Sequence, residues 1–188
     1  MFLMNIIPVA VGAAIAVLLI IVIWFVSVRN KFVRMEQDIE SSVSRIDVYL
    51  TKRYDLLTKM LAATKGFAKH ESELLVKVTE MRNPSSAQSL SEKSAINAEM
   101  DEVAKSINVA VEAYPDLKSD KVFVKLQSAI SEVEENLQAA RSNYNSNVSV
   151  FNKAILVFPN SIVAGSKFTK KDYFEAEAAK REDVKIEF

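Results

Sequence analysis

Apolar residues divide the chain into one unbroken hydrophobic stretch and three amphipathic stretches. Residues 6–28 are almost entirely apolar, whereas charged residues are frequent from residue 29 onwards. In residues 29–82 the apolar positions mostly recur every three or four residues, as they do on one face of a helix. The pattern predicts one long helix over 29–82, which ends at the Asn-Pro-Ser-Ser sequence of residues 83–86.

The same periodicity predicts two further long helices. The second begins near Ser89, where a short capping-box pattern is present, and it ends before Pro115. The third covers about residues 123–158 in a near-heptad rhythm, which favours long, nearly antiparallel packing. Residues 159–171 are expected to be irregular, and 172–180 are a candidate for a short helix.

Few turn-forming residues are present. The chain contains three glycines and four prolines, fewer than a sheet protein of this size normally uses in its turns. We therefore predict an all-α fold. It consists of an N-terminal transmembrane helix, an antiparallel up-and-down bundle of three long helices, and a short C-terminal helix.

The unbroken apolar stretch predicts a membrane anchor. Residues 6–28 comprise 23 residues, and roughly 20 helical residues span a bilayer core. A cleaved signal peptide is the alternative. The length of the apolar run, the lack of basic residues before it and the lack of a clear cleavage site oppose that alternative.

The distribution of basic residues predicts the orientation of this anchor. Arg29, Lys31 and Arg34 follow the apolar stretch directly, whereas residues 1–5 carry no charged side chain. The positive-inside rule then places residues 29–188 in the cytoplasm and the short N-terminus outside. The predicted location is the bacterial inner membrane, and the predicted division of the chain is 1–5, 6–28 and 29–188.

Composition excludes several classes of function. The 24 basic and 24 acidic residues balance, which argues against a nucleic-acid-binding protein. The chain contains no cysteine, so disulfides, cysteine-ligated zinc and thiol catalysis are excluded.

Residues with the potential for catalysis or metal binding are isolated. His70 is the one histidine, and Leu74 stands where the second histidine of an HExxH zinc motif would be. Neighbouring carboxylates such as Glu134 and Glu135 are typical of a solvated helix face. No glycine-rich phosphate loop is present. We therefore predict no catalytic, cofactor or metal site.

Charged and aromatic residues do interrupt the apolar face of the first helix in the segment IDVYLTKRYDLL, residues 46–57. The helical spacing places Arg53 at the edge of the core beside Tyr54, and a buried arginine needs polar partners. We expect a polar layer in which Arg53 and Tyr54 face Tyr144 and Asn145 of the third helix. Such a layer fixes the register of long helices, or it contacts a ligand or a partner. The candidate residues are Arg53, Tyr54, Asp55, Tyr144, Asn145 and Asn152.

An apolar, non-periodic segment follows the third helix at about residues 158–174. It can cover the core of the bundle itself, the membrane surface or a neighbouring protein. If the three helices alternate in direction, the third helix ends away from the membrane, which favours the core or a partner over lipid.

Five segments of the sequence carry a resemblance to a known family. In order, they read RIDVYLTKRYDLL, TKGFAKHESELL, AYPDLKSDKVFVKLQ, NYNSNVSVFNKAILVFPNSIVAG and KKDYFEAEAAK. Together with the apolar N-terminus they closely resemble the LemA family of bacterial membrane proteins. The resemblance implies a helical bundle on one transmembrane helix, with the N-terminus outside, and it implies no particular reaction. The sequence departs from the family pattern in two places: Thr58-Lys59 replaces a Pro-Asn pair, and Phe151 replaces a tyrosine.

These observations favour a non-enzymatic membrane-anchored scaffold or assembly protein. A ligand sensor whose bundle changes register, and a surface protein that faces away from the cytoplasm, are the alternatives. The expected partners are membrane lipid, through residues 6–28, and a second copy of the chain or another membrane or cytoplasmic protein. No cofactor and no nucleic acid are expected.

Overall fold

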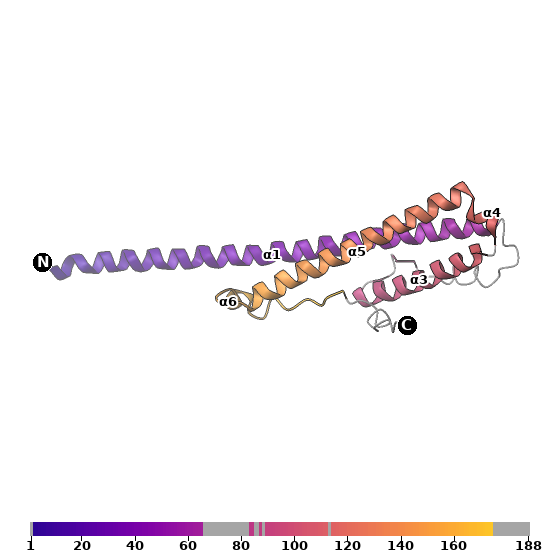
Figure 1. Ribbon diagram of the computed structural model, residues 1–188. Helices are drawn as coiled ribbons and strands as arrows, with labels where there is room; N and C mark the ends of the chain where they lie inside the picture. Colours follow the sequence, from indigo (N-terminus) through magenta and orange to yellow (C-terminus); the bar gives the residue numbers. More distant parts are fainter. Residues whose placement is uncertain (1, 66–82, 85–86, 88, 113, 175–188) are drawn as a thin grey trace, which may run out of the picture. The chain divides into compact units, whose positions relative to one another are not determined.

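The computed structural model describes residues 2–65, 83–84, 87, 89–112 and 114–174, and its regular elements are all helices (Figure 1). This confirms the all-α fold class and the long apolar helix at the N-terminus. The helices are α1 (Phe2–Lys65), α3 (Leu90–Glu112), α4 (Pro115–Lys118), α5 (Lys121–Leu156) and α6 (Asn160–Ala164).

Most predicted helix positions agree with the structure. The anchor and the first part of the predicted helix 29–82 form one continuous helix, α1, and residues 66–82 lie outside the described residues. Two differences occur near the C-terminus. The short helix α6 lies within residues 159–171, which were expected to be irregular. Residues 172–174 are not helical, and the remainder of the predicted helix 172–180 lies outside the described residues.

Local polar contacts explain where α3 and α5 begin. Ser89 Oγ accepts a hydrogen bond from the Glu92 amide, and Glu92 Oε2 accepts one from the Ser89 amide, both at 3.1 Å. This reciprocal pair is the predicted capping box. Asp120 Oδ1 accepts hydrogen bonds from the amides of Val122 and Phe123 at 2.9 Å, so it satisfies two of the free donors at the start of α5.

The chain divides into two compact units. The first comprises Met1–Glu40 and Ser146–Asp172, and the second comprises Ser41–Asn145 and Tyr173–Phe188. The helices α1 and α5 contribute residues to both units, and α3 and α4 belong to the second. The predicted division at residue 29 follows the expected membrane boundary, and it remains a prediction.

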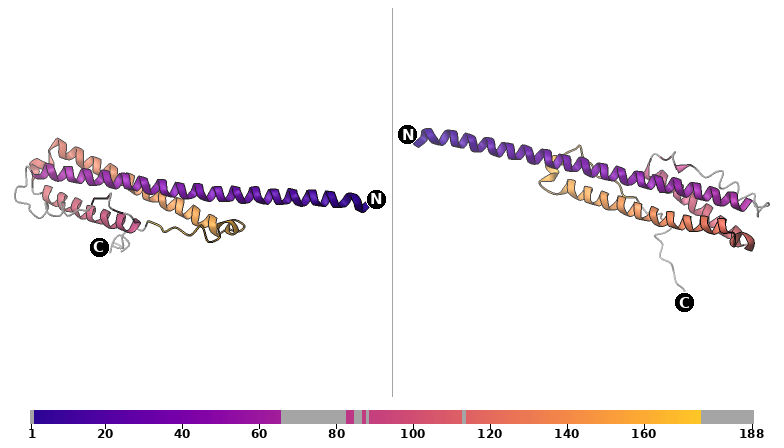
Figure 2. Two further views of the ribbon diagram at one scale, coloured as in Figure 1. Left: turned by 180° about the vertical axis from the view of Figure 1, so that it is seen from behind. Right: turned by 90° about the horizontal axis from the view of Figure 1, so that it is seen from above.

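In the second unit, α1, α3 and α5 pack around a shared apolar core. The pairs Asp47–Lys93 and Arg53–Asp101 show that α3 runs parallel to α1, unlike the simple alternation expected from the sequence (Figures 1 and 2). The most completely buried side chains of this core are those of Leu57, Met60, Ile96, Met100, Val103, Ile107, Leu117 and Phe123.

In the first unit, Phe32 of α1 lies at the centre of an aromatic cluster. Its ring packs edge-on against that of Phe151, with centroids 6.4 Å apart, and at a tilt against that of Phe168, with centroids 5.1 Å apart. Asn147 Nδ2 donates a hydrogen bond to the Asp38 carbonyl at 3.4 Å. The pairs 38–147 and 32–151 show that α1 and α5 run antiparallel here, so α5 ends beside the N-terminal part of α1. Simple alternation of three helices would make the first and the third parallel, so the expected direction of the third helix was wrong.

The N-terminal part of α1 presents apolar side chains on every side. Residues 10–27 are exposed apart from the half-buried Trp24, and burial begins at Val28. In the part of the chain that the structure describes, α1 is the one helix that is long and apolar enough to cross a membrane. A helix that is hydrophobic all round requires an apolar environment, and the described residues of the protein do not provide one for this segment.

Candidate functional site

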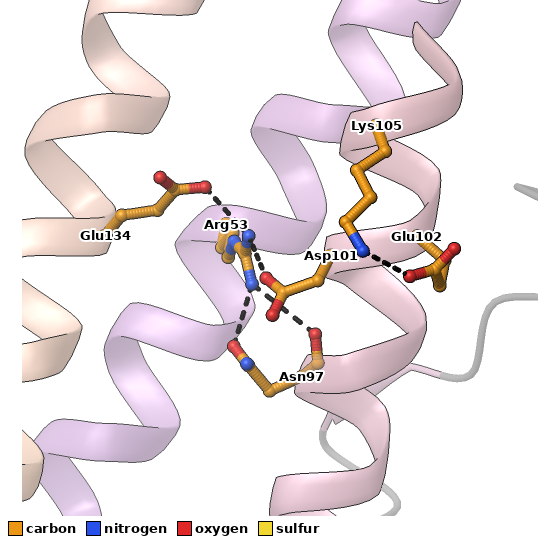
Figure 3. A network of polar contacts seen from close by, with 6 residues as sticks. All are labelled: Arg53, Asn97, Asp101, Glu102, Lys105 and Glu134. Carbon is orange, nitrogen blue, oxygen red and sulfur yellow. Dashed lines mark hydrogen bonds and ion pairs between the residues drawn. The ribbon is translucent and has the colours of Figure 1, made fainter. Parts of the chain in front are cut away.

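Arg53 forms a polar network in the core of the second unit (Figure 3). Its Nη1 donates to Asn97 Oδ1 at 2.8 Å and, at 3.5 Å, to the Asn97 carbonyl. Its Nη2 donates to Asp101 Oδ1 at 2.6 Å and to Glu134 Oε1 at 2.8 Å. One guanidinium from α1 therefore links α3 and α5. We call Arg53, Asn97, Asp101 and Glu134 the arginine network.

Burial makes this network sensitive to the loss of any member. Arg53 is 3% exposed, whereas Asp101 and Glu134 are 21% and 46% exposed. The planar guanidinium reaches acceptors on two helices at once, which a lysine ammonium cannot do with the same geometry. By contrast, the Glu102–Lys105 pair beside the network in Figure 3 is exposed at both ends, and such pairs contribute little to stability.

A second buried cation, Lys93, lies on α3 one turn before Asn97. Lys93 Nζ pairs with Asp47 Oδ1 of α1 and also lies 3.3 Å from the Ala87 carbonyl. This pair borders an open cleft of about 350 Å³. The cleft is lined by Asp47, Val48, Thr51, Pro84, Ala87 and Lys93.

The polar row on α3 was missed by the sequence analysis, although the sequence contains a signal for it. Lys93, Asn97 and Asp101 follow one another at four-residue steps, directly beside the apolar row that includes Ile96 and Met100. Residues four apart share a helix face. Lys93 and Asn97 are buried with the apolar row. A polar row at the edge of an apolar face indicates polar contacts with another helix, but it does not show which residue of that helix is the partner.

Two asparagines of α5 hold the segment that follows α6. In the first unit, Asn152 Oδ1 accepts from the Lys171 amide, and its Nδ2 donates to the Lys171 carbonyl, both at 2.9 Å. In the second unit, Asn145 makes the same pair of bonds to the amide and carbonyl of Phe174, at 2.8 and 3.0 Å. Each side-chain amide thus satisfies both backbone groups of one residue.

The spacing of these asparagines matches the spacing of their partners. A separation of seven residues on a helix such as α5 covers roughly 10 Å. A separation of three residues in an extended chain also covers roughly 10 Å. Asn145 and Asn152 are seven apart, and Lys171 and Phe174 are three apart. The asparagine spacing therefore suits the binding of an extended segment.

Both features lie within sequence that matches a family. The sequence model of the LemA family matches residues 42–188, which include the arginine network and both asparagines. The chain belongs to the LemA family. It is also 29% identical over 142 residues to the protein LemA of Metamycoplasma hominis. That match covers 74% of this chain and 65% of the relative, so the chain spans less than two thirds of that protein's length.

The LemA-family segment RIDVYLTKRYDLL contributes Arg53 to the interior, as its position on the helix predicted. Its partners differ from those expected, because Arg53 bonds to Asn97, Asp101 and Glu134. Tyr54 packs half-buried against the core, and Asp55 is exposed.

The LemA-family segment NYNSNVSVFNKAILVFPNSIVAG holds the three remaining candidates. Tyr144 is buried in the core, whereas Asn145 and Asn152 bond to the backbone of the segment after α6. The residues expected to form one polar layer therefore take part in two separate sets of contacts. Arg53 belongs to the arginine network, whereas Asn145 and Asn152 bind the segment after α6. A contact of any of these residues with a ligand or a partner protein stays a prediction.

The arginine network has little room for a ligand beside it. The cleft next to Glu134 has a volume of about 100 Å³, below the roughly 300–1,000 Å³ of typical ligand sites. Among the described residues, no group of three or more acidic or histidine side chains is arranged to hold a metal ion, and His70 lies outside those residues. The arrangement of the network is that of a structural connection between helices.

Proposed function

We propose that this LemA-family protein is a non-enzymatic, single-pass membrane protein that acts as a scaffold or assembly factor. The observation that carries this proposal is the continuity of α1. One helix contains both the apolar residues 10–27, which are exposed apart from the half-buried Trp24, and the buried positions of the bundle from Val28 onwards. Lipid is the environment that suits the first part, and the second part provides a helical surface next to the membrane.

The basic residues at the end of the apolar stretch support a cytoplasmic bundle at the inner membrane. Arg29, Lys31 and Arg34 are all exposed on α1. Basic residues close to the end of a membrane helix favour the cytoplasmic side. The short N-terminus then lies outside the cytoplasm.

The use of polar groups inside the bundle supports a scaffold over an enzyme. Arg53, Lys93, Asn145 and Asn152 all bond to other groups of the protein. Their polar atoms are engaged in fixing helices and the segment after α6. Catalytic groups, by contrast, need to reach a substrate.

In-cell photo-crosslinking tests the scaffold. A photoreactive amino acid is placed at Asp55 on α1, Lys125 on α5 or Lys170 after α6, all of which are exposed. The buried Leu57 provides the matched control, from which no intermolecular adduct is expected. We expect discrete adducts from at least one exposed position, either to a second copy or to another protein. Full-length, folded protein that gives no adduct at any exposed position contradicts the proposal, and adducts to proteins outside the cytoplasm contradict the orientation.

The open cleft beside Lys93 favours a ligand sensor as the second candidate function. Its volume of about 350 Å³ lies within the range of typical small-molecule sites. Asp47 of α1 and Lys93 of α3 form the ion pair at its edge. A ligand that replaces one partner of this pair would change the contact between the two helices. Absence of crosslinks from the exposed positions would favour this candidate.

A further inference from the structure

The end of α5 and the short helix α6 expose several large apolar side chains. We call residues 156–162 the apolar tip. The exposed fractions in the tip are 59% for Leu156, 57% for Val157, 76% for Phe158 and 65% for Ile162. The next residues of α6, Val163 and Ala164, are buried. One side of α6 is therefore held against the protein, while the apolar side chains of the tip face outwards. Contiguous exposed apolar groups of this kind mark contact sites.

Contacts within the first unit show where this tip lies along α1. Asp38 is paired with Asn147, and six residues nearer the N-terminus Phe32 packs against Phe151. Continuing this antiparallel register brings the end of α5 level with about Val28. Figures 1 and 2 show α6 and the end of α5 beside α1 at this point.

Val28 is also where the exposed apolar part of α1 ends. Residues 10–27 lie before it, with Trp24 and Phe25 in the last turn. Tryptophan and phenylalanine rings at the end of a spanning segment are typical of the membrane interface. The apolar tip therefore lies level with the end of α1 at which the expected membrane boundary occurs.

The chain on the far side of the tip is also fixed to α1. Phe168 packs on Phe32 with ring centroids 5.1 Å apart, and Lys171 pairs with Glu36 at 2.8 Å. The residues before the tip, on α5, and the residues after it therefore both contact α1. Both ends of the tip are held, so its exposed side chains have a defined position in the first unit.

Exposed cations lie near the tip, within a few residues of it along the chain and on the part of α1 that is level with it. Arg29 and Lys31 are exposed on α1, Lys153 is exposed near the end of α5, and Lys167 is exposed after α6. The acidic residues of α1 begin only at Glu36, about two turns further from the apolar stretch than Arg29. This charge distribution suits the anionic headgroups of a cytoplasmic leaflet.

We propose that the apolar tip inserts into the boundary between headgroups and acyl chains of the bilayer that α1 crosses, while the nearby cations bind anionic headgroups. The inference rests on the proposed membrane anchor, and it adds a second, interfacial contact. Apolar side chains flanked by cations bind membranes in this way. The first unit would then be fixed to the membrane at two points.

Fluorophores attached to single cysteines test this contact in the full-length protein. The chain has no native cysteine, so Phe158→Cys or Ile162→Cys gives one labelling site. The matched control is Val109→Cys on α3, which is 69% exposed in the second unit. Ile15→Cys reports on the anchor. Each labelled variant is reconstituted into nanodiscs of phosphatidylcholine and phosphatidylglycerol, and quenching by aqueous iodide and by lipids brominated near the headgroup is measured.

The labels at 158 and 162 are expected to be quenched by the brominated lipid and protected from iodide. The label at 109 is expected to show the reverse. Quenching by iodide at 158 to the same extent as at 109 overturns the inference, and protection from both quenchers overturns it too, because protein then covers the tip. The label at 15 lies near the middle of the apolar stretch, so it is tested with lipid brominated near the ends of the acyl chains. It separates the two proposals: if this lipid does not quench it, the anchor itself is wrong.

The same label at Phe158→Cys tests whether the contact depends on the charge of the lipid. In nanodiscs of phosphatidylcholine alone, quenching by brominated lipid is expected to fall. Adding Lys153→Gln and Lys167→Gln is expected to reduce the quenching in the anionic nanodiscs as well. The matched control carries Lys121→Gln and Lys125→Gln, two changes at exposed lysines of the second unit, and its quenching is expected to stay unchanged. Equal quenching in all of these samples would overturn the role of the cations.

Discussion

At the scale of single residues, Arg53 is the buried charge with the most partners in the described core. We expect Arg53→Met to lower the free energy of unfolding by about 2–4 kcal/mol, because it leaves Asp101 and Asn97 without their buried donor. This loss of stability should be smaller than the loss on breaking a fully buried ion pair, because the carboxylates of Asp101 and Glu134 keep access to water. Chemical denaturation of the full-length protein in detergent, followed by helical circular dichroism, measures it.

The exposed Arg45 on the same helix provides the matched control for this prediction. Arg45→Met should change stability by no more than about 0.5 kcal/mol, as most surface substitutions do. Adding Asp101→Leu to Arg53→Met should restore part of the loss, because the double change removes a carboxylate that has lost its bond to the buried Arg53. Equal stability of Arg53→Met and Arg45→Met would show that the network does not hold the helices together.

The position of Arg53 was predictable from sequence, but its partners were not. Periodicity along one helix shows which residues share a face, so it placed Arg53 at the core. Partners depend on which helix lies beside that face and in which direction it runs. We expected the partners on the third helix, whereas the parallel arrangement of α1 and α3 brings Asn97 and Asp101 to Arg53.

At the scale of elements, the segment after α6 depends on side chains of α5 because it has no helix or sheet of its own. We expect Asn152→Ala to lower stability by about 1–3 kcal/mol, since the amide and carbonyl of Lys171 lose their partners. Amide hydrogen exchange of residues 168–172 should accelerate, and mass spectrometry of the corresponding peptides measures it.

Asn136 provides the matched control for this substitution. It also lies on α5, but its side chain bonds to the Glu132 carbonyl one turn earlier on the same helix. Asn136→Ala should therefore leave exchange in residues 168–172 unchanged. If the two variants give the same exchange rates, the segment is held by its aromatic and ionic contacts and not by Asn152.

Elements with a strong periodic pattern were predicted well, and those that depend on packing were not. The capping box at Ser89 and the ends of α3 and α5 follow from local chemistry that the sequence shows directly. The helix α6 has only five residues, Asn160–Ala164, too few for a periodic signal. Its two buried residues, Val163 and Ala164, show that packing stabilises it.

At the scale of the whole molecule, one continuous helix joins a part that suits lipid to a part that suits a protein core. The two parts need not depend on each other for stability. Side chains of residues 10–27 are exposed, and only 6% of the most apolar window of α1 is buried. The buried positions begin at Val28, so the cores of both units contain no buried residue from 10–27.

We therefore expect a chain that begins at Val28 to fold without the apolar stretch. It should leave the membrane fraction and keep the denaturation midpoint of the full-length protein measured in the same detergent. Any difference between the two denaturation midpoints should be small, because Trp24 is the one half-buried side chain among residues 10–27. The apolar tip should still give weak, reversible binding to anionic vesicles, since an interfacial contact alone anchors less firmly than a spanning helix. Loss of helicity in the shortened chain would instead mean that the apolar stretch packs against protein.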